Sequence, residues 1–204
     1  MNPIFTIGHS THSSDEFINL LKAHEVTAVG DVRSSPYSKF NPQFNRELLR
    51  GVLNEEEISY VFLGEELGPR SRDPDCYDHG RISYERLART ELFKKGIERL
   101  KKGARMHRIA LMCAEKDPIV CHRMILVCRN IRSIGYDIYH ILEDGSTETL
   151  RESEKRLLKL LNIPELQLFE TPEDLICRAY KIQGEKIAYR KDSDEQERNG
   201  FESD

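Results

Sequence analysis

The stretch CAEKDPIVCHR, near the middle of the chain, gathers several chemically active side chains. Such a set could bind a metal ion, attack a substrate through a thiolate, bind an anion or pack in a core. The spacing of its two cysteines is unusual for zinc ligands, and no fourth ligand stands out. Adjacent residues of a helix also point about 100° apart, so we predict no metal and no cofactor here. The residues concerned are Cys113, Glu115, Cys121, His122 and Arg123.

Cys121 is the candidate nucleophile of this stretch. It would lie in the first turn of a helix that starts at Asp117 and Pro118, where the helix dipole lowers the pKa of a thiol. The neighbouring His122 and Arg123 would lower that pKa further. A buried position on the apolar face of the same helix is the alternative, and the sequence leaves both interpretations open.

Around these residues, apolar and amphipathic segments alternate along the chain. Short apolar runs predict strands, and segments with helical periodicity lie between them. This repeated alternation predicts an α/β fold: a single doubly wound, mostly parallel sheet of five or six strands, with helices on both faces and extra C-terminal helices. The predicted strands are 3–9, 27–32, 58–64, 108–114 and 136–142, and the predicted helices are 15–25, 46–57, 83–103, 119–134, 151–163 and 171–189.

Length and composition favour one domain. The chain has 204 residues and a net charge of −4, and we place a single α/β domain at residues 1–190. Residues 191–204 hold two basic and six acidic residues, which predicts an acidic disordered tail. No apolar run approaches the ~18 residues of a membrane helix. Five irregularly spaced cysteines favour free thiols, so we expect a cytoplasmic protein with no membrane partner.

Polar residues follow each of the first four predicted strands. In an open parallel sheet, ligands bind outside the carboxyl ends of the strands, so these residues are expected to converge on one crevice. Two of the loops are also longer than the usual 2–6 residues, as functional loops often are. The residues are His9 and Ser10 after the first strand, Asp31 and Arg33 after the second, Gly64, Gly68 and Arg70 after the third, and Glu115, Cys121, His122 and Arg123 after the fourth.

The arginines among these residues favour an anionic ligand. Arg33, Arg70 and Arg123 offer planar donors suited to phosphate, and the loop glycines leave backbone N–H groups accessible. Pairing with nearby acids is an alternative for each arginine. Two carboxylates on neighbouring strand ends, Asp31 and Glu115, are candidates for general acid–base work. The pattern predicts a phosphate-bearing substrate, either a small molecule such as a nucleotide or a nucleic acid.

Four motifs together resemble the domain of unknown function 488 family: TIGHS, DVRSSPYSKFNPQFN, YVFLGEELGPR and CAEKDPIVCHR. The resemblance spans roughly residues 3–145 and implies a compact α/β protein, although the family has no assigned reaction. Pro69 stands where a second glycine is common, so the approach of the third loop to a ligand is in question. The matching motif positions are His9, Ser10, Asp31, Arg33, Pro36, Ser38, Gly64, Gly68, Glu115, Cys121, His122 and Arg123.

The sequence supports three hypotheses of function. In the first, a hydrolytic enzyme holds a phosphate-bearing nucleotide or nucleic-acid component while Asp31 or Glu115 activates water. In the second, Cys121 attacks the substrate with His122 or His9 as the base. In the third, the domain binds a nucleotide or nucleic acid without catalysis. The sequence leaves the oligomeric state open.

Overall fold

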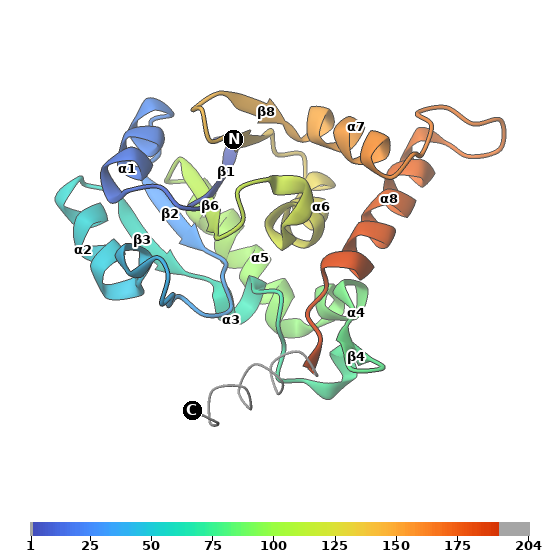
Figure 1. The fold of residues 1–204 in the computed structure, drawn as a ribbon, viewed down its shortest axis with the longest axis horizontal. Helices are drawn as coiled ribbons and strands as arrows, with labels where there is room; N and C mark the ends of the chain where they lie inside the picture. The colour runs from blue at the N-terminus through green and yellow to red at the C-terminus, as the bar shows by residue number, and fades with distance from the viewer. Residues whose placement is uncertain (1, 192–204) are drawn as a thin grey trace.

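The computed structural model describes residues 2–191 and is built around a six-stranded sheet (Figure 1). The spatial order of the strands is β3-β2-β6-β1-β7-β8. The first five of these run parallel, and β8 pairs antiparallel with β7. The predicted mostly parallel α/β sheet is therefore confirmed. The strands are β1 (Ile4–Gly8), β2 (Ala28–Asp31), β3 (Ser59–Phe62), β6 (Ile109–Cys113), β7 (Ile138–Ile141) and β8 (Thr147–Thr149).

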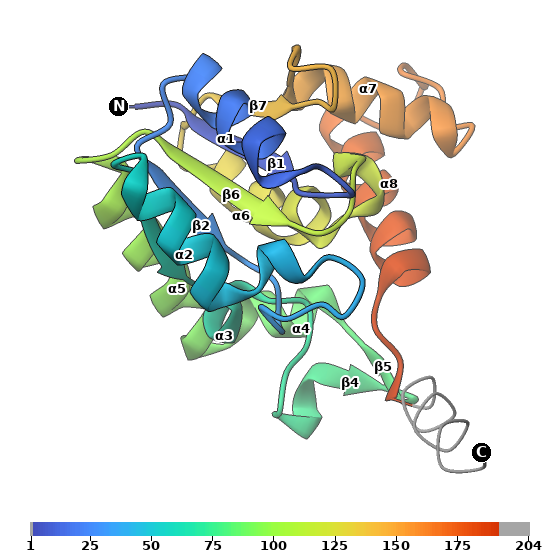
Figure 2. The same ribbon diagram turned by 60° about the vertical axis from the view of Figure 1, so that its left-hand side comes forward.

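Helices cover both faces of the sheet, as predicted (Figure 2). One face packs against α1 (Ser14–Ala23) and α2 (Arg46–Glu55), and the other against α5 (Glu91–Ala104) and the helices around it. Because side chains alternate between the faces of a strand, Ala110 and Met112 of β6 join the first core and Ile109, Leu111 and Cys113 the second. The remaining helices are α3 (Gly64–Leu67), α4 (Tyr84–Arg89), α6 (Arg129–Arg132), α7 (Leu150–Leu160) and α8 (Pro172–Ile187).

Local capping chemistry explains where several helices begin. The hydroxyl of Ser13 accepts a hydrogen bond from the backbone N–H of Glu16, and the backbone N–H of Ser13 donates to the carboxylate of Glu16. This reciprocal capping box starts α1. Thr149 starts α7 and Thr171 starts α8 in the same way. The two C-terminal helices predicted from the sequence are thus confirmed.

Two predicted helices are broken in the structure. The helix expected over 83–103 divides at Thr90, whose backbone is extended (φ −65°, ψ 147°) and whose hydroxyl accepts from the N–H of Phe93 to cap α5. The helix expected over 119–134 begins as a 3-10 turn, η3 (Pro118–Val120), and breaks at the extended Cys121 (φ −123°, ψ 141°). It resumes as a π-helix, η4 (Arg123–Cys128), that leads into α6.

Short elements occupy the long loops that precede α2 and α4. Two of them form a small hairpin outside the main sheet, which the sequence did not indicate. They are η1 (Pro42–Phe44), η2 (Pro74–Cys76), β4 (Tyr77–Asp78) and β5 (Arg81–Ile82).

The strand order creates a topological switch point between β1 and β6. From β1 the chain continues through α1 on one face of the sheet, and from β6 it continues through η4 and α6 on the other. Ligands of open α/β sheets bind at such points, outside the carboxyl ends of the strands. No helix within residues 2–191 is long and apolar enough to cross a membrane. The predicted acidic tail, apart from Lys191, lies outside the described residues.

Candidate functional site

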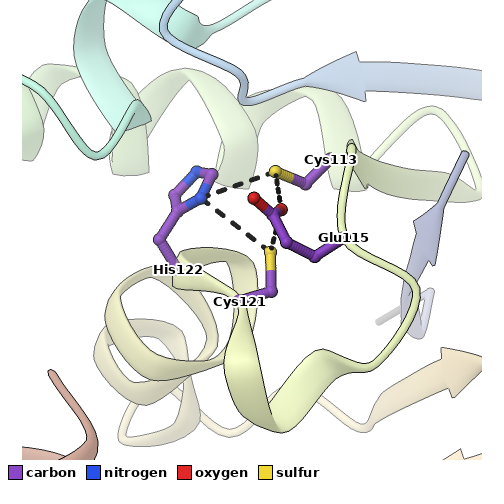
Figure 3. Close-up of side chains that lie close together, drawn as sticks. All are labelled: Cys113, Glu115, Cys121 and His122. Carbon is purple, nitrogen blue, oxygen red and sulfur yellow. Dashed lines mark hydrogen bonds between the residues drawn. The ribbon is translucent and has the colours of Figure 1, made fainter. Parts of the chain in front are cut away.

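Four reactive side chains meet at the carboxyl end of β6, beside the switch point (Figure 3). One ligand-type atom from each of Cys113, Glu115, Cys121 and His122 lies within 4.8 Å of the others. Glu115 Oε2 is 2.8 Å from Cys113 Sγ and 3.0 Å from Cys121 Sγ. His122 Nδ1 is 3.5 Å and 3.9 Å from the same two sulfur atoms. Both thiols and the imidazole are buried, whereas Glu115 lies at the surface with its carboxylate turned inward.

The break in the chain at Cys121 brings this cluster together. Cys113 ends β6, and the extended backbone of Cys121 turns its side chain toward β6 before η4 begins. Cys121 and His122 therefore point to one place, rather than about 100° apart as on a helix. The sequence argument against a metal site assumed that helix, and this premise is wrong. The structure also adds Glu115 to the group.

The tautomer of His122 follows from its second contact. Its Nε2 lies 2.9 Å from the backbone carbonyl oxygen of Val32, which can only accept a hydrogen bond. Nε2 therefore carries the proton, and the lone pair of Nδ1 faces the two sulfur atoms. A backbone carbonyl that accepts from one imidazole nitrogen fixes the tautomer and the orientation of the ring. The lone pair of the other nitrogen then has a defined direction and can serve as a ligand or a base.

Arg123 positions the loop that carries Glu115. Its side chain is fully buried, and it donates to the backbone carbonyl oxygens of Glu115 and Lys116 and to the hydroxyl of Thr6. The same loop passes so close to β1 that a Cβ on Gly8 would overlap the carbonyl oxygen of Glu115. Arg123 thus acts on the backbone of its own chain, and the anion cradle of three arginines expected from the sequence is not formed here.

The protonation of the cluster differs from the expectation for a thiolate nucleophile. Burial raises the pKa of Cys121 well above its ordinary value, and the neighbouring Cys113 adds to this effect. Burial also opposes ionisation of Glu115, but hydrogen bonds from the two thiols outweigh it and lower the pKa of that carboxyl. The predicted lowering of the Cys121 pKa is wrong, and the cluster as it stands holds two thiols around a carboxylate.

Asp31 and Arg33 form a buried ion pair next to this cluster. Arg33 Nε donates to Asp31 Oδ1 at 2.9 Å, and Nη2 donates to Oδ2 at 2.7 Å. Tyr60 donates its hydroxyl to Oδ2, also at 2.7 Å. Asp31 has no exposed surface, so its carboxylate is occupied by Arg33 and Tyr60 rather than presented to a substrate. Sequence reasoning missed Tyr60, whose inward position shows only in the alternation of β3.

His9 is a neutral member of the same network. It is buried against the ring of Phe44, with the ring centroids 4.3 Å apart. Its Nδ1 donates to the carbonyl oxygen of Ser10 at 3.0 Å, and its Nε2 accepts from Arg33 Nη1 at 3.2 Å. Burial and the charge of Arg33 lower the pKa of His9 to about 4. The imidazole orients Arg33, and the backbone N–H of Ser10 bonds to the carbonyl oxygen of Ala114.

The predicted residues of the third loop lie at a cleft of about 640 Å³. A Cβ on Gly68 would overlap the hydroxyl of Ser34, so this glycine permits close packing of two loops. The backbone N–H of Arg70 donates to the same hydroxyl, and its guanidinium lies 4.2 Å from the ring centroid of Tyr189. The cleft is lined by Ser34, Gly64, Glu65, Glu66, Arg70, Ser71, Arg72, Asp73, Leu87, Thr90, Glu91 and Leu92.

The structure thus divides the predicted residues among three neighbouring places. Glu115, Cys121 and His122 form the reactive cluster, together with Cys113, which was not among the predicted site residues. A Cys-x-Glu pattern directly after a buried strand is the signal that could have identified Cys113. Asp31, Arg33 and His9 form the buried network. Gly64 and Arg70 line the cleft, and the buried Gly68 packs against Ser34 beside it.

A comparison with family models matches residues 13–129 to the domain of unknown function DUF488. The chain belongs to this family. The matched segment contains every residue of the reactive cluster and both members of the buried ion pair, while His9 and Ser10 precede it. Searches of curated proteins and of solved structures returned no match to the chain.

Proposed function

We propose that this DUF488 protein is a hydrolase in which Glu115 is the acid–base group. The observation that carries the proposal is the contact of the Glu115 carboxylate with two thiols beside the imidazole of His122. Glu115 is a surface residue at the switch point of the sheet, where a substrate can approach, and its carboxylate is turned toward the cluster. Its lowered pKa keeps it ionised at neutral pH, as a general base requires.

The reaction is a displacement by water. Glu115 takes one proton from the water while the oxygen of the water bonds to the electrophilic atom of the substrate. The bond to the leaving group then breaks, and the proton passes from Glu115 to that group. The products are a hydroxylated fragment and a protonated leaving group, and the carboxylate is regenerated.

A phosphate-bearing nucleotide or nucleic-acid component is the proposed substrate. The support is the cleft that begins at Ser34, two residues after the carbonyl that contacts His122. Arg70 and Arg72 line this cleft with exposed side chains, and guanidinium groups suit phosphate oxygens. In this proposal the cleft binds the anionic part while the scissile bond reaches Glu115.

The two other hypotheses have less support. A Cys121 nucleophile would need a thiolate, and burial works against it. A non-catalytic nucleotide-binding module would leave the cluster of Cys113, Glu115, Cys121 and His122 without a role. The cytoplasmic location expected from the sequence is kept as part of the proposal, and the five free cysteines support it.

Substitution of Glu115 by glutamine tests the function. Purified protein is incubated with nucleosides, nucleoside phosphates and short single- and double-stranded oligonucleotides, and products are identified by mass spectrometry. Once a substrate is found, Glu115→Gln should lower kcat by about 10²–10⁴-fold, the usual contribution of general acid–base catalysis. The KM should change little, because the cleft is left intact.

Glu55→Gln is the matched control, since it makes the same chemical change at the exposed C-terminal end of α2. This variant should keep the wild-type kcat. Wild-type turnover by Glu115→Gln would contradict the assignment of the acid–base group. Binding of a nucleotide with no product from any substrate would instead favour the non-catalytic module.

A further inference from the structure

The geometry of the reactive cluster points to a zinc site. We propose that Cys113, Cys121 and His122 bind a zinc ion and that Glu115 stands beside its fourth coordination position. The inference rests on the proposed function only for the role given to that fourth position. The ligand set itself is argued from distances, hydrogen bonds and burial.

The two separations between the imidazole nitrogen of His122 and the thiol sulfur atoms suit one tetrahedral ion. With zinc–sulfur bonds of about 2.3 Å and zinc–nitrogen bonds of about 2.0–2.1 Å, a tetrahedral site places sulfur and nitrogen about 3.6 Å apart. His122 Nδ1 lies 3.5 Å from Cys113 Sγ and 3.9 Å from Cys121 Sγ. Each sulfur–nitrogen separation is therefore within a few tenths of an ångström of the tetrahedral value, and the two sulfur atoms lie within 4.8 Å of each other.

The second contact of His122 prepares it as a ligand. Metal-binding histidines almost always donate their other ring N–H to a carbonyl or carboxylate, which fixes the tautomer and the direction of the free lone pair. The Nε2–H of His122 donates to the carbonyl oxygen of Val32 and aims Nδ1 at the sulfur atoms.

Charge also favours zinc at this place. Thiolate and imidazole ligands suit zinc, whereas magnesium and calcium prefer oxygen ligands. Two thiolates cancel the charge of the ion, so the buried part of the site becomes neutral and avoids the cost of an unpaired buried charge. Within residues 2–191, no other group of three or more histidine, cysteine or acidic side chains comes together in this way.

Glu115 is better placed to act on a fourth ligand than to be one. Its Oε2 is 2.8 Å and 3.0 Å from the sulfur atoms, which fits thiol donors and is shorter than the roughly 3.5 Å between sulfur and oxygen ligands of one zinc ion. Once the thiols lose their protons, the carboxylate loses both donors and is repelled by the thiolates. A water on the zinc would supply a new donor, and zinc lowers the pKa of such a water to about 7.

Direct metal measurements on the full chain test the inference. Protein produced with zinc in the medium and dialysed should retain about one zinc ion per chain. The metal-free protein titrated with cobalt(II) should show thiolate-to-cobalt charge-transfer absorption and the strong visible bands of a tetrahedral site. A protein that retains no zinc and gives no such spectrum would overturn the proposal without recourse to any variant.

Variants assign the ligands. Cys113→Ser, Cys121→Ser and His122→Asn should each reduce bound zinc to below about a tenth of an ion per chain. Cys128→Ala and Cys177→Ser, which change a buried and an exposed thiol outside the cluster, should retain the full amount. Equal loss in ligand and control variants would overturn the assignment, and circular dichroism shows whether each variant is folded.

Glu115→Gln separates the open site from a four-ligand site. It should retain about one zinc ion per chain, because three protein ligands remain. Loss of zinc from this variant would contradict the claim that the fourth coordination position is open, because Glu115 would then be a ligand. Zinc is measured without substrate, so the two proposals can fail separately. Hydrolysis by a protein that binds no zinc would contradict this inference alone. A protein that binds zinc but hydrolyses nothing would contradict the proposed function alone.

Discussion

The carboxylate of Asp31 illustrates at the scale of one residue how burial changes the role of a charged group. It accepts hydrogen bonds from Arg33 and Tyr60 and has no contact with solvent. Desolvation of both ions works against the attraction between them, so the pair itself contributes modest net stability. The removal of one partner is a different matter, because it leaves the other charge buried and unpaired.

We therefore predict that Asp31→Asn mainly affects stability. The change should lower the free energy of unfolding by about 3–5 kcal/mol, because Arg33 keeps its charge with one oxygen acceptor fewer and no negative partner. Urea unfolding measures this difference. The double variant Asp31→Asn/Arg33→Met should recover part of the loss, since no unpaired charge remains.

An exposed ion pair provides the control. Glu56 pairs with Lys22 on the surface, and Glu56→Gln should cost less than about 1 kcal/mol. If Asp31→Asn were as stable as this control while turnover vanished, Asp31 would be a catalytic group after all.

At the scale of elements, the junction of β6, η3 and η4 determines the geometry of the site. Asp117 caps η3 by accepting from the N–H of Ile119, which confirms the predicted cap. The chain then departs from a helix at Cys121, and the π-helix that follows carries Arg123 inward to the carbonyl oxygens of the Glu115 loop. Segments of π-helix are rare and frequently lie at functional sites.

Gly8→Ala tests how closely this junction is packed on β1. An added Cβ would overlap the carbonyl oxygen of Glu115, and the backbone cannot yield without moving the whole loop. We expect a loss of about 1–3 kcal/mol, the usual cost of overpacking. For a chain of this size, each kcal/mol corresponds to a fall in Tm of about 2–4 °C. Calorimetry measures the change.

Gly51→Ala is the matched control. Gly51 lies within α2, and a Cβ there would meet nothing within 4 Å. Alanine is favoured over glycine inside a helix by roughly 0.5–1 kcal/mol, so the Tm of this variant should stay constant or rise. Equal effects of the two substitutions would show that the loop of Glu115 does not depend on close contact with β1.

Periodicity and capping residues were sufficient to predict the strands, the helices on both faces and the strand ends where polar residues gather. The breaks at Thr90 and Cys121 were not predicted, because each lies in a segment whose apolar spacing suits a continuous helix. At Thr90 the hydroxyl caps the N–H of Phe93 and starts a new helix, and at Cys121 the extended backbone brings the thiol to Glu115. Apolar spacing encodes neither contact. For the same reason Arg33 and Arg123 looked like ligand-binding groups, whereas their donors are used by Asp31, His9 and backbone carbonyl oxygens.

At the scale of the whole molecule, one buried polar network connects the centre of the sheet to η4. Thr6 of β1 contacts His140 Nδ1 of β7 at 2.7 Å and accepts a hydrogen bond from Arg123. All three side chains are fully buried. Burial and the charges of Arg123 and Arg156 lower the pKa of His140 to about 3, against a smaller opposing effect of Asp117. The folded protein therefore contains a histidine that cannot easily take up a proton.

Because of this histidine, the free energy of unfolding should fall as the pH is lowered, at pH values above the range in which carboxyl groups titrate. Between its ordinary pKa of 6.5 and its folded value of about 3, the unfolded chain binds a proton that the folded chain does not. The contribution is fully present above pH 6.5 and is lost as pH falls below it, with a slope of up to about 1.4 kcal/mol per pH unit. His9, with its pKa lowered to about 4, acts in the same direction.

Urea unfolding between pH 5 and 7 separates the effect of the two histidines from that of the carboxyl groups, because the ordinary pKa values of carboxyl groups lie below that window. His140→Asn retains an amide that can bond to Thr6 but removes the titrating group. Its slope of unfolding free energy against pH should be smaller than that of the wild type by about 1 kcal/mol per pH unit near pH 5.5. The same change at the exposed His79 should preserve the wild-type slope. If His140→Asn leaves the slope of unfolding free energy against pH unchanged, the core accepts a charged imidazole. The Thr6–His140–Arg123 network would then have to rearrange when His140 takes up a proton, and it would not hold the sheet and η4 in one arrangement.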